Sequence, residues 1–295
     1  MKQRVIALGF FDGVHLGHAA LLRAAKQRAA ECKATAAALL FDRHPAEVLG
    51  GAPVPLLNTT EERALLMQRL YHIDEVIPFH FNSETAAMPW DQFVRTVLVE
   101  QLHACAVVAG FDFRFGHRGA GTAEKLSRLC ATLGLGCDII PCVTLDGVPI
   151  SSSVIRDMIS AGDVRRAAHF LGHFPFFCAP IEHGAALGRK LGAPTINQRL
   201  APPRCLPRFG VYVTRVRAGG ASYRGVTNIG TRPTVSDAQT VRAETYILDF
   251  SGDLYGQSVE LELLHLIRPE QRFPNLDALH AAIAQDIAFA ARYPL

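Results

Sequence analysis

The chain has 295 residues, a length that suggests two domains of ordinary size. Its formal net charge of +3 is too small to indicate a nucleic-acid-binding protein, and 49% hydrophobic residues are typical of a globular chain with a buried core. We find no apolar run of the about 18 residues that would cross a membrane, no secretory leader and no Cys-x-x-Cys pair among the seven cysteines. We therefore expect a cytoplasmic protein without a zinc site, whose thiols are reduced and mostly buried.

The first half of the chain alternates strand-like and helix-like segments. Such a pattern is typical of a parallel sheet covered on both faces, which binds ligands beyond the carboxyl ends of its strands. Thr59 and Glu62 fit a capping box that opens the second helix. The apolar runs are 5–10, 36–41, 76–81, 104–109 and 137–142, and the amphipathic stretches lie near 18–33, 59–71, 89–103 and 122–134.

A conspicuous run directly follows the first apolar segment and leads into the first helix-like one. It reads Gly-Phe-Phe-Asp-Gly-Val-His-Leu-Gly-His over residues 9–18. A helix start attracts anions through free N–H groups, imidazoles there add hydrogen bonds, and Gly17 lets the backbone approach a ligand closely. This geometry suits nucleotidyl transfer, in which an α-phosphate gains charge as it is attacked. For His15 and His18 alone, a turn with two solvated histidines is the alternative.

Two further polar motifs follow in the first half. Hydroxyls at 151–153 start a helix and Arg156 lies one turn later, an arrangement that suits a polyphosphate clamp as well as a purely structural cap. The run Gly-Phe-Asp-Phe-Arg-Phe-Gly at 110–116 places Asp112 and Arg114 among aromatic residues at a strand end. It favours a ligand pocket over a simple core cluster.

From about residue 172 the pattern changes to short β-rich segments punctuated by Gly, Pro and Asp. They indicate an antiparallel sheet or small barrel, closed by a helix from about 276 to 292. Segments 153–160 and 164–171 are helix-like and connect the halves. We therefore expect an α/β protein with domains 1–171 and 172–295.

A glycine-rich segment, residues 183–197, opens this second part. Its backbone N–H groups could wrap phosphates, and residues two apart on an extended segment share a face. Thr195 and Asn197 could then bind one Mg²⁺ through oxygen atoms, with a structural hairpin as the alternative reading.

These motifs together resemble one family. Residues 9–18 resemble the signature of HxGH nucleotidylyltransferases in the form found in bacterial FAD synthetases, and 150–156 resemble the Ile-Ser-Ser-Thr-x-x-Arg motif that accompanies it. Residues 110–116 resemble the flavin and nucleotide loop of the same family, and 188–197 resemble the core motif of riboflavin kinases. With further matching pieces at 210–212, 228–234, 244–250, 254–256 and 268–273, the chain is similar to prokaryotic bifunctional riboflavin kinase/FMN adenylyltransferases over nearly its whole length.

The resemblance implies a Rossmann-like nucleotidylyltransferase domain with a parallel sheet, followed by a small antiparallel riboflavin kinase-like β-barrel with a closing helix. It implies that the barrel phosphorylates riboflavin with ATP and Mg²⁺ to give FMN, and that the first domain transfers AMP from ATP to FMN, giving FAD and pyrophosphate. His15 and His18 would stabilise developing charge, and Glu244 would be the base of the kinase.

The same resemblance supplies two sets of binding residues. The residues implied to bind nucleotide or phosphate are Gly9, Phe11, Gly17, Ser152, Ser153, Arg156, Gly184, Gly188, Arg189, Gly192, Thr195 and Asn197. Thr195 and Asn197 would also bind Mg²⁺. Those for the flavin are Asp112, Phe113, Arg114, Arg268 and Phe273. Residues 178–180, Cys-Ala-Pro, replace a glycine that is usual in the family. Of the two implied activities, the kinase activity is the one that this replacement would affect.

Three alternatives stay open from the sequence. One is an FMN adenylyltransferase whose kinase half is impaired, and another is a related transferase with a different acceptor, such as pantetheine phosphate or nicotinamide mononucleotide. The third is a nucleic-acid-binding barrel, although the second half lacks a basic stripe with interleaved aromatic residues. We expect small molecules as partners, with neither nucleic acid nor a membrane.

Overall fold

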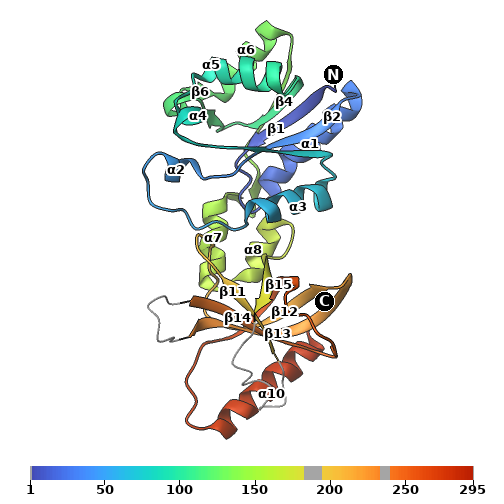
Figure 1. Ribbon diagram of the computed structural model, residues 1–295, viewed down its shortest axis with the longest axis vertical. Coiled ribbons are helices and arrows are strands. Elements are labelled where there is room, and N and C mark those ends of the chain that lie inside the picture. Colours follow the sequence, from blue (N-terminus) through green and yellow to red (C-terminus); the bar gives the residue numbers. More distant parts are fainter. Residues whose placement is uncertain (1, 183–194, 233–239, 295) are drawn as a thin grey trace. The chain divides into compact units, whose positions relative to one another are not determined.

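The computed structural model describes residues 2–182, 195–232 and 240–294, and the chain divides into two compact units, Met1–Ser152 and Ser153–Leu295. The first unit is built on a five-stranded parallel sheet in the order β3-β2-β1-β4-β7 (Figure 1). The expected parallel sheet is thus confirmed. Its strands are β1 (Arg4–Gly9), β2 (Thr35–Phe41), β3 (Glu75–Phe79), β4 (Ala104–Gly110) and β7 (Gly136–Ile140).

Helices cover both faces of this sheet. Ile6 and Leu8 of β1 belong to the core cluster on the face that carries α6 and the π-helix. Val5 and Ala7, equally buried, point to the opposite face, where α1 and α3 pack. The helices are α1 (Leu16–Cys32), α2 (Pro45–Val48), α3 (Thr60–Tyr71), α4 (Ser83–Ala87), α5 (Trp90–Gln92), the π-helix Phe93–Gln101 and α6 (Ala123–Leu133).

The strand order places a crevice between two particular strands. The chain leaves β1 toward β2 on one side, whereas it leaves β4 toward β7 on the other. Open α/β sheets bind ligands where the connections diverge in this way, outside the carboxyl ends of the strands. Residues 10–15 follow β1 and residues 111–116 follow β4, so two of the sequence motifs meet at this crevice.

The predicted start of the helix at residue 59 is confirmed, whereas other local predictions differ from the structure. The capping box at α3 is present, with Thr59 Oγ1 accepting from the Glu62 N–H at 3.2 Å and the Glu62 carboxylate accepting from the Thr59 N–H at 2.9 Å. The stretch 89–103 differs from expectation because only α5 is α-helical and the rest is π-helical. Two small hairpins were missed because two-residue strands show no periodicity, namely β5 (Arg114–Phe115) with β6 (Gly121–Thr122), and β8 (Thr144–Leu145) with β9 (Val148–Pro149).

The second unit contains a closed antiparallel barrel in the order β10-β11-β14-β13-β12-β15, as expected. Tyr212, Val216 and Leu261 are among the buried side chains of its core cluster. Strand β11 was not expected as a separate element. The strands are β10 (Phe176–Glu182), β11 (Thr195–Leu200), β12 (Gly210–Ala218), β13 (Ala221–Arg232), β14 (Thr240–Ile247) and β15 (Ser258–Pro269).

Helices α7, α8 and α10 accompany the barrel in the described part of the second unit. The helix α7 (Ser152–Ala161) begins at the last residue of the first unit, and α8 (Val164–Leu171) contributes Val164 to the barrel core cluster. The expected closing helix is α10 (Leu276–Arg292), which packs on β12 and β13. The unit boundary therefore falls directly after the first residue of α7, whereas the sequence-based boundary at 171/172 groups both connecting helices with the first domain.

The cysteines require a correction. None of the seven forms a disulfide, but only Cys130 and Cys205 are buried, whereas Cys32, Cys142 and Cys178 are exposed. The expectation of mostly buried thiols failed because apolar neighbours in the sequence do not determine which side of an element faces solvent. In the part of the chain that the structure describes, no helix is both long and apolar enough to cross a membrane.

Candidate active sites

The turn between β1 and α1 has an unusual backbone that aims two histidines at the crevice. Phe11 and Val14 have φ values of +57° and +41°, and both side chains are fully buried. Non-glycine residues rarely adopt this left-handed region, so burial of their side chains must hold them there. Gly13, with φ of +82°, completes the reversal, and α1 then begins with His15 as its N-cap.

Contacts within the turn define the state of His15. Its Nδ1 accepts a hydrogen bond from the His18 backbone N–H at 3.3 Å, so neutral His15 carries its proton on Nε2. The two imidazoles stack with centroids 3.6 Å apart and an interplanar angle of 13°. A Cβ at position 17 would lie 3.0 Å from His15 Cε1. Gly17 therefore makes room for the stacked rings as well as for a ligand.

His18 is held uncharged at neutral pH. Burial lowers its pKa well below the ordinary value of 6.5, and the positive charges of His15 and Arg63 lower it further. Its Nδ1 is buried and lacks a hydrogen-bond partner within the described residues. A buried polar atom of this kind requires a partner, and a ligand at the crevice can supply one. The neutral imidazole can donate a hydrogen bond to a phosphate without carrying a charge.

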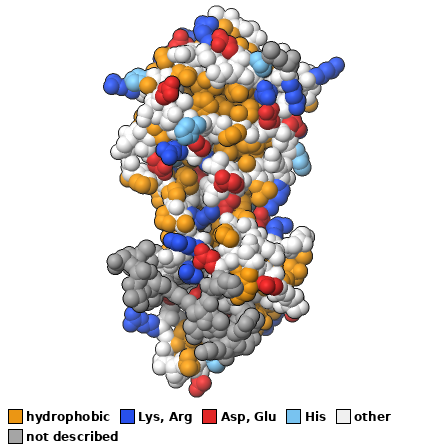
Figure 2. All heavy atoms as spheres, in the orientation of Figure 1, with side chains coloured by type: hydrophobic (Ala, Val, Ile, Leu, Met, Phe, Trp, Pro, Cys, Tyr) orange, Lys and Arg blue, Asp and Glu red, His pale blue; other side chains and the backbone are white. Residues whose placement is uncertain are grey.

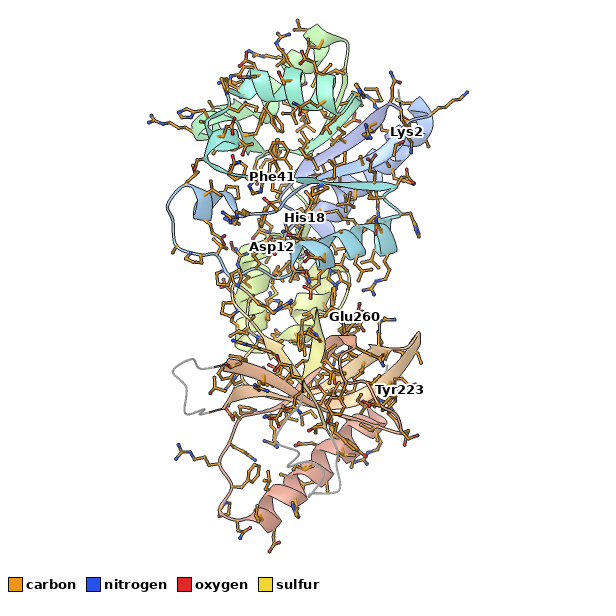
Figure 3. All side chains as sticks on the ribbon, viewed as in Figure 1. Lys2, Asp12, His18, Phe41, Tyr223 and Glu260 are labelled. Carbon is orange, nitrogen blue, oxygen red and sulfur yellow. The ribbon has the colours of Figure 1, made fainter. Side chains whose placement is uncertain are left out.

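A pocket of about 680 Å³ lies at these residues. Figure 3 labels His18 and Phe41, two of the residues that line it. Eight of the sequence-predicted site residues line it: Gly9, His15, Gly17, His18, Asp112, Phe113, Arg114 and Ser152. Phe11 does not, because its side chain is fully buried and its ring packs beside His18 at 5.2 Å. The Phe11 side chain supports the turn from beneath, and its contact with nucleotide stays a prediction.

One wall of the pocket is aromatic. Phe113 and Phe115 stack at 5.2 Å, and Phe41 meets Phe81 edge to face at 5.7 Å. Hydrophobic side chains also gather on one face of the first unit (Figure 2). Flat rings of this kind suit a planar aromatic ligand. Several lining residues carry no motif and were missed by the sequence analysis, among them Leu49, Phe81, Thr85 and Arg118.

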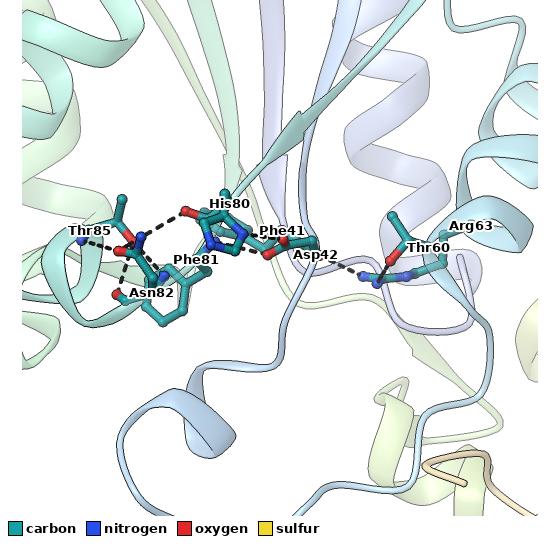
Figure 4. Close-up of polar contacts among 8 residues, drawn as sticks. All are labelled: Phe41, Asp42, Thr60, Arg63, His80, Phe81, Asn82 and Thr85. Carbon is teal, nitrogen blue, oxygen red and sulfur yellow. Dashed lines mark hydrogen bonds and ion pairs between the residues drawn. The ribbon is translucent and has the colours of Figure 1, made fainter. Parts of the chain in front are cut away.

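Polar contacts tie this wall to the sheet. The Asp42 carboxylate, at the end of β2, contacts His80 Nδ1 at 2.6 Å and accepts from the Phe81 N–H at 2.9 Å (Figure 4). The hydrogen bonds from Phe81, His80 and the Arg43 backbone outweigh burial and keep the pKa of Asp42 below its ordinary value. Asp42 therefore stays ionised and fixes the loop that carries Phe81.

The serine motif is distributed between the two units. Ser152 Oγ donates to the Asp12 backbone carbonyl at 2.9 Å, which joins the start of α7 to the β1–α1 turn. Ser153 and Arg156 belong to the second unit, where the Arg156 guanidinium donates to Ser153 Oγ at 3.0 Å. Ser152 thus lines the pocket. Ser153, the next residue of α7, is in contact with Arg156, one helical turn later.

Strand pairing in the barrel aligns residues that lie far apart in the sequence. Glu244 of β14 is opposite Asn197 of β11 and opposite Asn228 of β13. Val211 continues the line on β12 and Arg268 ends it on β15. Residues directly opposite each other share one face of a sheet, so these five residues form one line, called the barrel row below. Asn228 was missed as a site residue, although it opens one of the matching pieces.

Oxygen atoms dominate the first part of the barrel row. Asn197 is opposite Glu244, and Thr195, two residues earlier on β11, lies beside the row on the same face. Hydroxyl, amide and carboxylate oxygens are the ligands that Mg²⁺ accepts, so this donor set fits the expected ion. The predicted phosphate-binding residues Gly184, Gly188, Arg189 and Gly192 lie outside the described residues.

The predicted flavin residues of the barrel are close together. The Arg268 guanidinium lies 5.3 Å from the centre of the Phe273 ring. It also binds the buried carboxylate of Asp286 on α10, with a shortest distance of 2.8 Å. Arg268 therefore anchors the closing helix, and its planar group is held in a fixed orientation at the end of the barrel row.

Fold and sites together define a two-domain, nucleotide-dependent transferase. One domain is a doubly wound sheet with the His15–His18 turn at its crevice. The other is a closed barrel in which the carboxylate residue Glu244 is opposite Asn197. Residues 1–154 match the family model described as FAD synthetase, and residues 171–294 match the one described as riboflavin kinase. The chain belongs to the bifunctional riboflavin kinase/FMN adenylyltransferase family.

Individual relatives agree with this assignment. The bifunctional riboflavin kinase/FMN adenylyltransferase of Listeria monocytogenes is 35% identical over 96% of this chain and 90% of its own length. That of Pseudomonas fluorescens is 34% identical over 97% and 91%. A solved structure of a Streptococcus pneumoniae protein named as a macrolide-efflux protein is 30% identical, with a TM-score of 0.88 over 99% of this chain and 95% of that one.

Proposed function

We propose that the chain makes FAD from riboflavin in two steps, one in each unit. The riboflavin kinase-like barrel transfers the γ-phosphate of ATP to riboflavin, which gives FMN and ADP. The FAD synthetase-like unit joins FMN to the AMP moiety of a second ATP and releases pyrophosphate. The observation that carries this proposal is the stacked His15–His18 pair at the crevice of a sheet whose pocket has an aromatic wall.

In adenylyl transfer, a phosphate oxygen of FMN bonds to the α-phosphorus of ATP and the bond to the β-phosphate bridge breaks. Negative charge rises on the α-phosphate oxygens during this step. The His15 Nε2–H and a neutral His18 donate hydrogen bonds to them, together with N–H groups at the start of α1. Ser152, Ser153 and Arg156 hold the departing pyrophosphate, and Asp112, Phe113 and Arg114 orient the flavin.

In the kinase reaction, the terminal ribityl oxygen of riboflavin bonds to the γ-phosphorus and ADP departs. The Glu244 carboxylate accepts the hydroxyl proton, while Arg268 and Phe273 orient the flavin. Thr195 and Asn197 would hold Mg²⁺, which when bound neutralises phosphate charge. Gly184, Gly188, Arg189 and Gly192 supply phosphate contacts in this proposal.

The setting of the enzyme is proposed on chemical grounds. Its substrates and products are small soluble molecules, and a net charge of +3 favours neither nucleic acid nor an anionic membrane as a partner. We therefore propose that it works in the cytoplasm, with a functional boundary near residue 172 between the two activities.

Incubation with riboflavin, ATP and Mg²⁺, followed by chromatographic separation of riboflavin, FMN and FAD, tests the proposal. The wild-type chain should form FMN and then FAD. His15→Ala and His18→Ala should each slow FAD formation from FMN by about 10²–10³-fold, because one phosphate donor is lost. Both variants should still form FMN at the wild-type rate. A folded variant that loses both reactions would refute the division of labour.

A further inference from the structure

Arg63 of α3 is a buried charge that the proposed reactions leave without a role. It is fully buried and is the largest such side chain in the described structure. Taking a guanidinium out of water is costly unless surrounding groups compensate for its lost hydration. A methionine or leucine would fill the same volume more cheaply, so the charge itself calls for an explanation.

The hydrogen bonds of Arg63 join the ends of two strands. Its Nη1 donates to the Phe10 carbonyl at 2.6 Å and to the Phe41 carbonyl at 3.3 Å. Phe10 directly follows β1, and Phe41 is the last residue of β2. Nη2 donates to Thr60 Oγ1 at 3.1 Å, which fixes the guanidinium relative to α3 (Figure 4). One planar group therefore holds two strand ends at the crevice.

Arg63 also lies directly behind the pocket. Its guanidinium carbon is 4.5 Å from the centre of the Phe10 ring, and Phe10 and Phe41 both line the pocket. The carboxylates of Asp12, Glu61 and Asp42 partly offset the burial that lowers its pKa, and an arginine remains charged at any physiological pH. A permanent positive charge thus stands next to Phe10, which lines the pocket.

We propose that Arg63 is a positioning residue for adenylyl transfer, which holds the ends of β1 and β2 and places a fixed positive charge behind the His15–His18 pair. This inference rests on the proposed role of the two histidines. The electrostatic part acts through His18, because the Arg63 charge opposes its protonation, as do burial and His15. The geometric part acts through Phe10 and Phe41, whose carbonyl groups both accept from Nη1, while Nη2 and Nε hold the planar guanidinium to Thr60 and Thr59.

Three variants of the full-length protein separate these parts from a merely structural role. Arg63→Met keeps most of the side-chain volume and removes the charge. Arg63→Lys keeps the charge and removes the planar guanidinium group. Arg69→Met is the matched control, because Arg69 is an exposed arginine on the same helix. The measurements are kcat and KM for FAD formation from FMN, riboflavin phosphorylation in the same preparations, and the NMR titration of His18. The His18 signal is assigned by its loss in His18→Gln.

In Arg63→Met we expect the His18 pKa to rise toward 6.5 and kcat for FAD to fall at least tenfold, with KM for FMN and ATP changed less than threefold. Arg63→Lys should keep the low His18 pKa and recover part of kcat. Riboflavin phosphorylation should be unchanged in both variants, and Arg69→Met should match the wild type throughout.

A folded Arg63→Met protein with wild-type kcat and an unchanged His18 titration would overturn the inference. If Arg63→Met fails to fold, Arg63→Lys decides the geometric part, because a wild-type kcat would overturn it. An ordinary His18 pKa in the wild-type protein would overturn the electrostatic part whatever the variants do. A wild-type chain that makes no FAD would instead contradict the proposed function, which keeps the two failures distinct.

Discussion

At the residue scale, the stacked histidines show how contacts set chemical state. His15 Nδ1 is occupied by the His18 N–H, and His18 is held neutral by burial and by two neighbouring positive charges. His18 therefore acts as an uncharged donor at neutral pH. Because electrostatic preorganisation acts through fixed dipoles, the exact placement of these rings matters more than their basicity.

Gly17→Ala tests this placement. An added Cβ would lie 3.0 Å from His15 Cε1 and 3.1 Å from its Nδ1, so the His15 ring must shift by a few tenths of an ångström. We expect kcat for FAD formation to fall on the order of tenfold, since small misplacements of reacting groups are costly. Alanine favours a helix over glycine by up to about 1 kcal/mol, so thermal stability should not fall. Unchanged FAD kinetics would show that the stack tolerates the methyl group.

The barrel row makes a separate prediction for Glu244. Glu244→Gln retains size and removes the base, so kcat for riboflavin phosphorylation should fall about 10²-fold or more while KM for riboflavin changes little. Initial rates of FMN formation across riboflavin concentrations measure this. The control is Glu260→Gln, another barrel glutamate, which pairs with Arg217 at 3.1 Å and lies outside the row. Wild-type turnover by Glu244→Gln would leave this carboxylate without a catalytic role.

At the scale of elements, α8 belongs with the barrel, although only its last residue, Leu171, falls within the riboflavin kinase match. Val164 is 1% exposed and is part of the barrel core cluster. A helix that fills a core position cannot be removed without exposing apolar surface to water. The shortest fragment with kinase activity and the shortest fragment with full barrel stability can therefore begin at different residues.

Two fragments test that difference. Residues 172–295 should fold and retain some riboflavin kinase activity, whereas residues 153–295 should be more stable by about 2 kcal/mol or more. Burial of one valine side chain alone contributes about 1.5–3 kcal/mol. Urea unfolding followed by circular dichroism gives both free energies of unfolding. Equal midpoints and slopes for the two fragments would mean that α8 adds nothing to the barrel.

At the scale of the whole molecule, each unit has its own core, and the two proposed reactions use different residues. The first unit has a cluster that includes Ile6 and Leu8, and the second has a cluster that includes Tyr212 and Leu261. Nothing in the two proposed reactions requires a shared residue, because FMN is a complete small molecule that can leave one site and enter another.

A mixture of two inactivated proteins tests this independence. His18→Ala should stop at FMN, and Glu244→Gln should form FAD only when FMN is supplied. Mixed in the presence of riboflavin and ATP, the two variants should together form FAD, after a lag while FMN accumulates in solution. A time course by chromatography, with each variant alone as the control, measures it. Failure of the mixture, with both single reactions intact, would indicate that FMN does not pass through solution.

The sequence by itself determined the parallel sheet, the barrel, the closing helix and the family. Those inferences rest on patterns contained within short stretches of chain, such as apolar periodicity, the capping box at Thr59 and the run at 9–18. Helix and strand signals are local, so they survive without knowledge of the fold. The two-residue strands and the π-helix after Gln92 escaped because they are too short or too irregular to show a period.

Only the tertiary structure decided which distant residues meet. Arg63 lies 53 residues from Phe10 and 22 from Phe41, and no spacing in the chain marks it as the group that joins them. Strand pairing likewise brings Asn197, Glu244 and Asn228 into one row, because register depends on the whole barrel. Burial, which sets the protonation of His18, is a property of the packed molecule, since it depends on everything that excludes water from the imidazole.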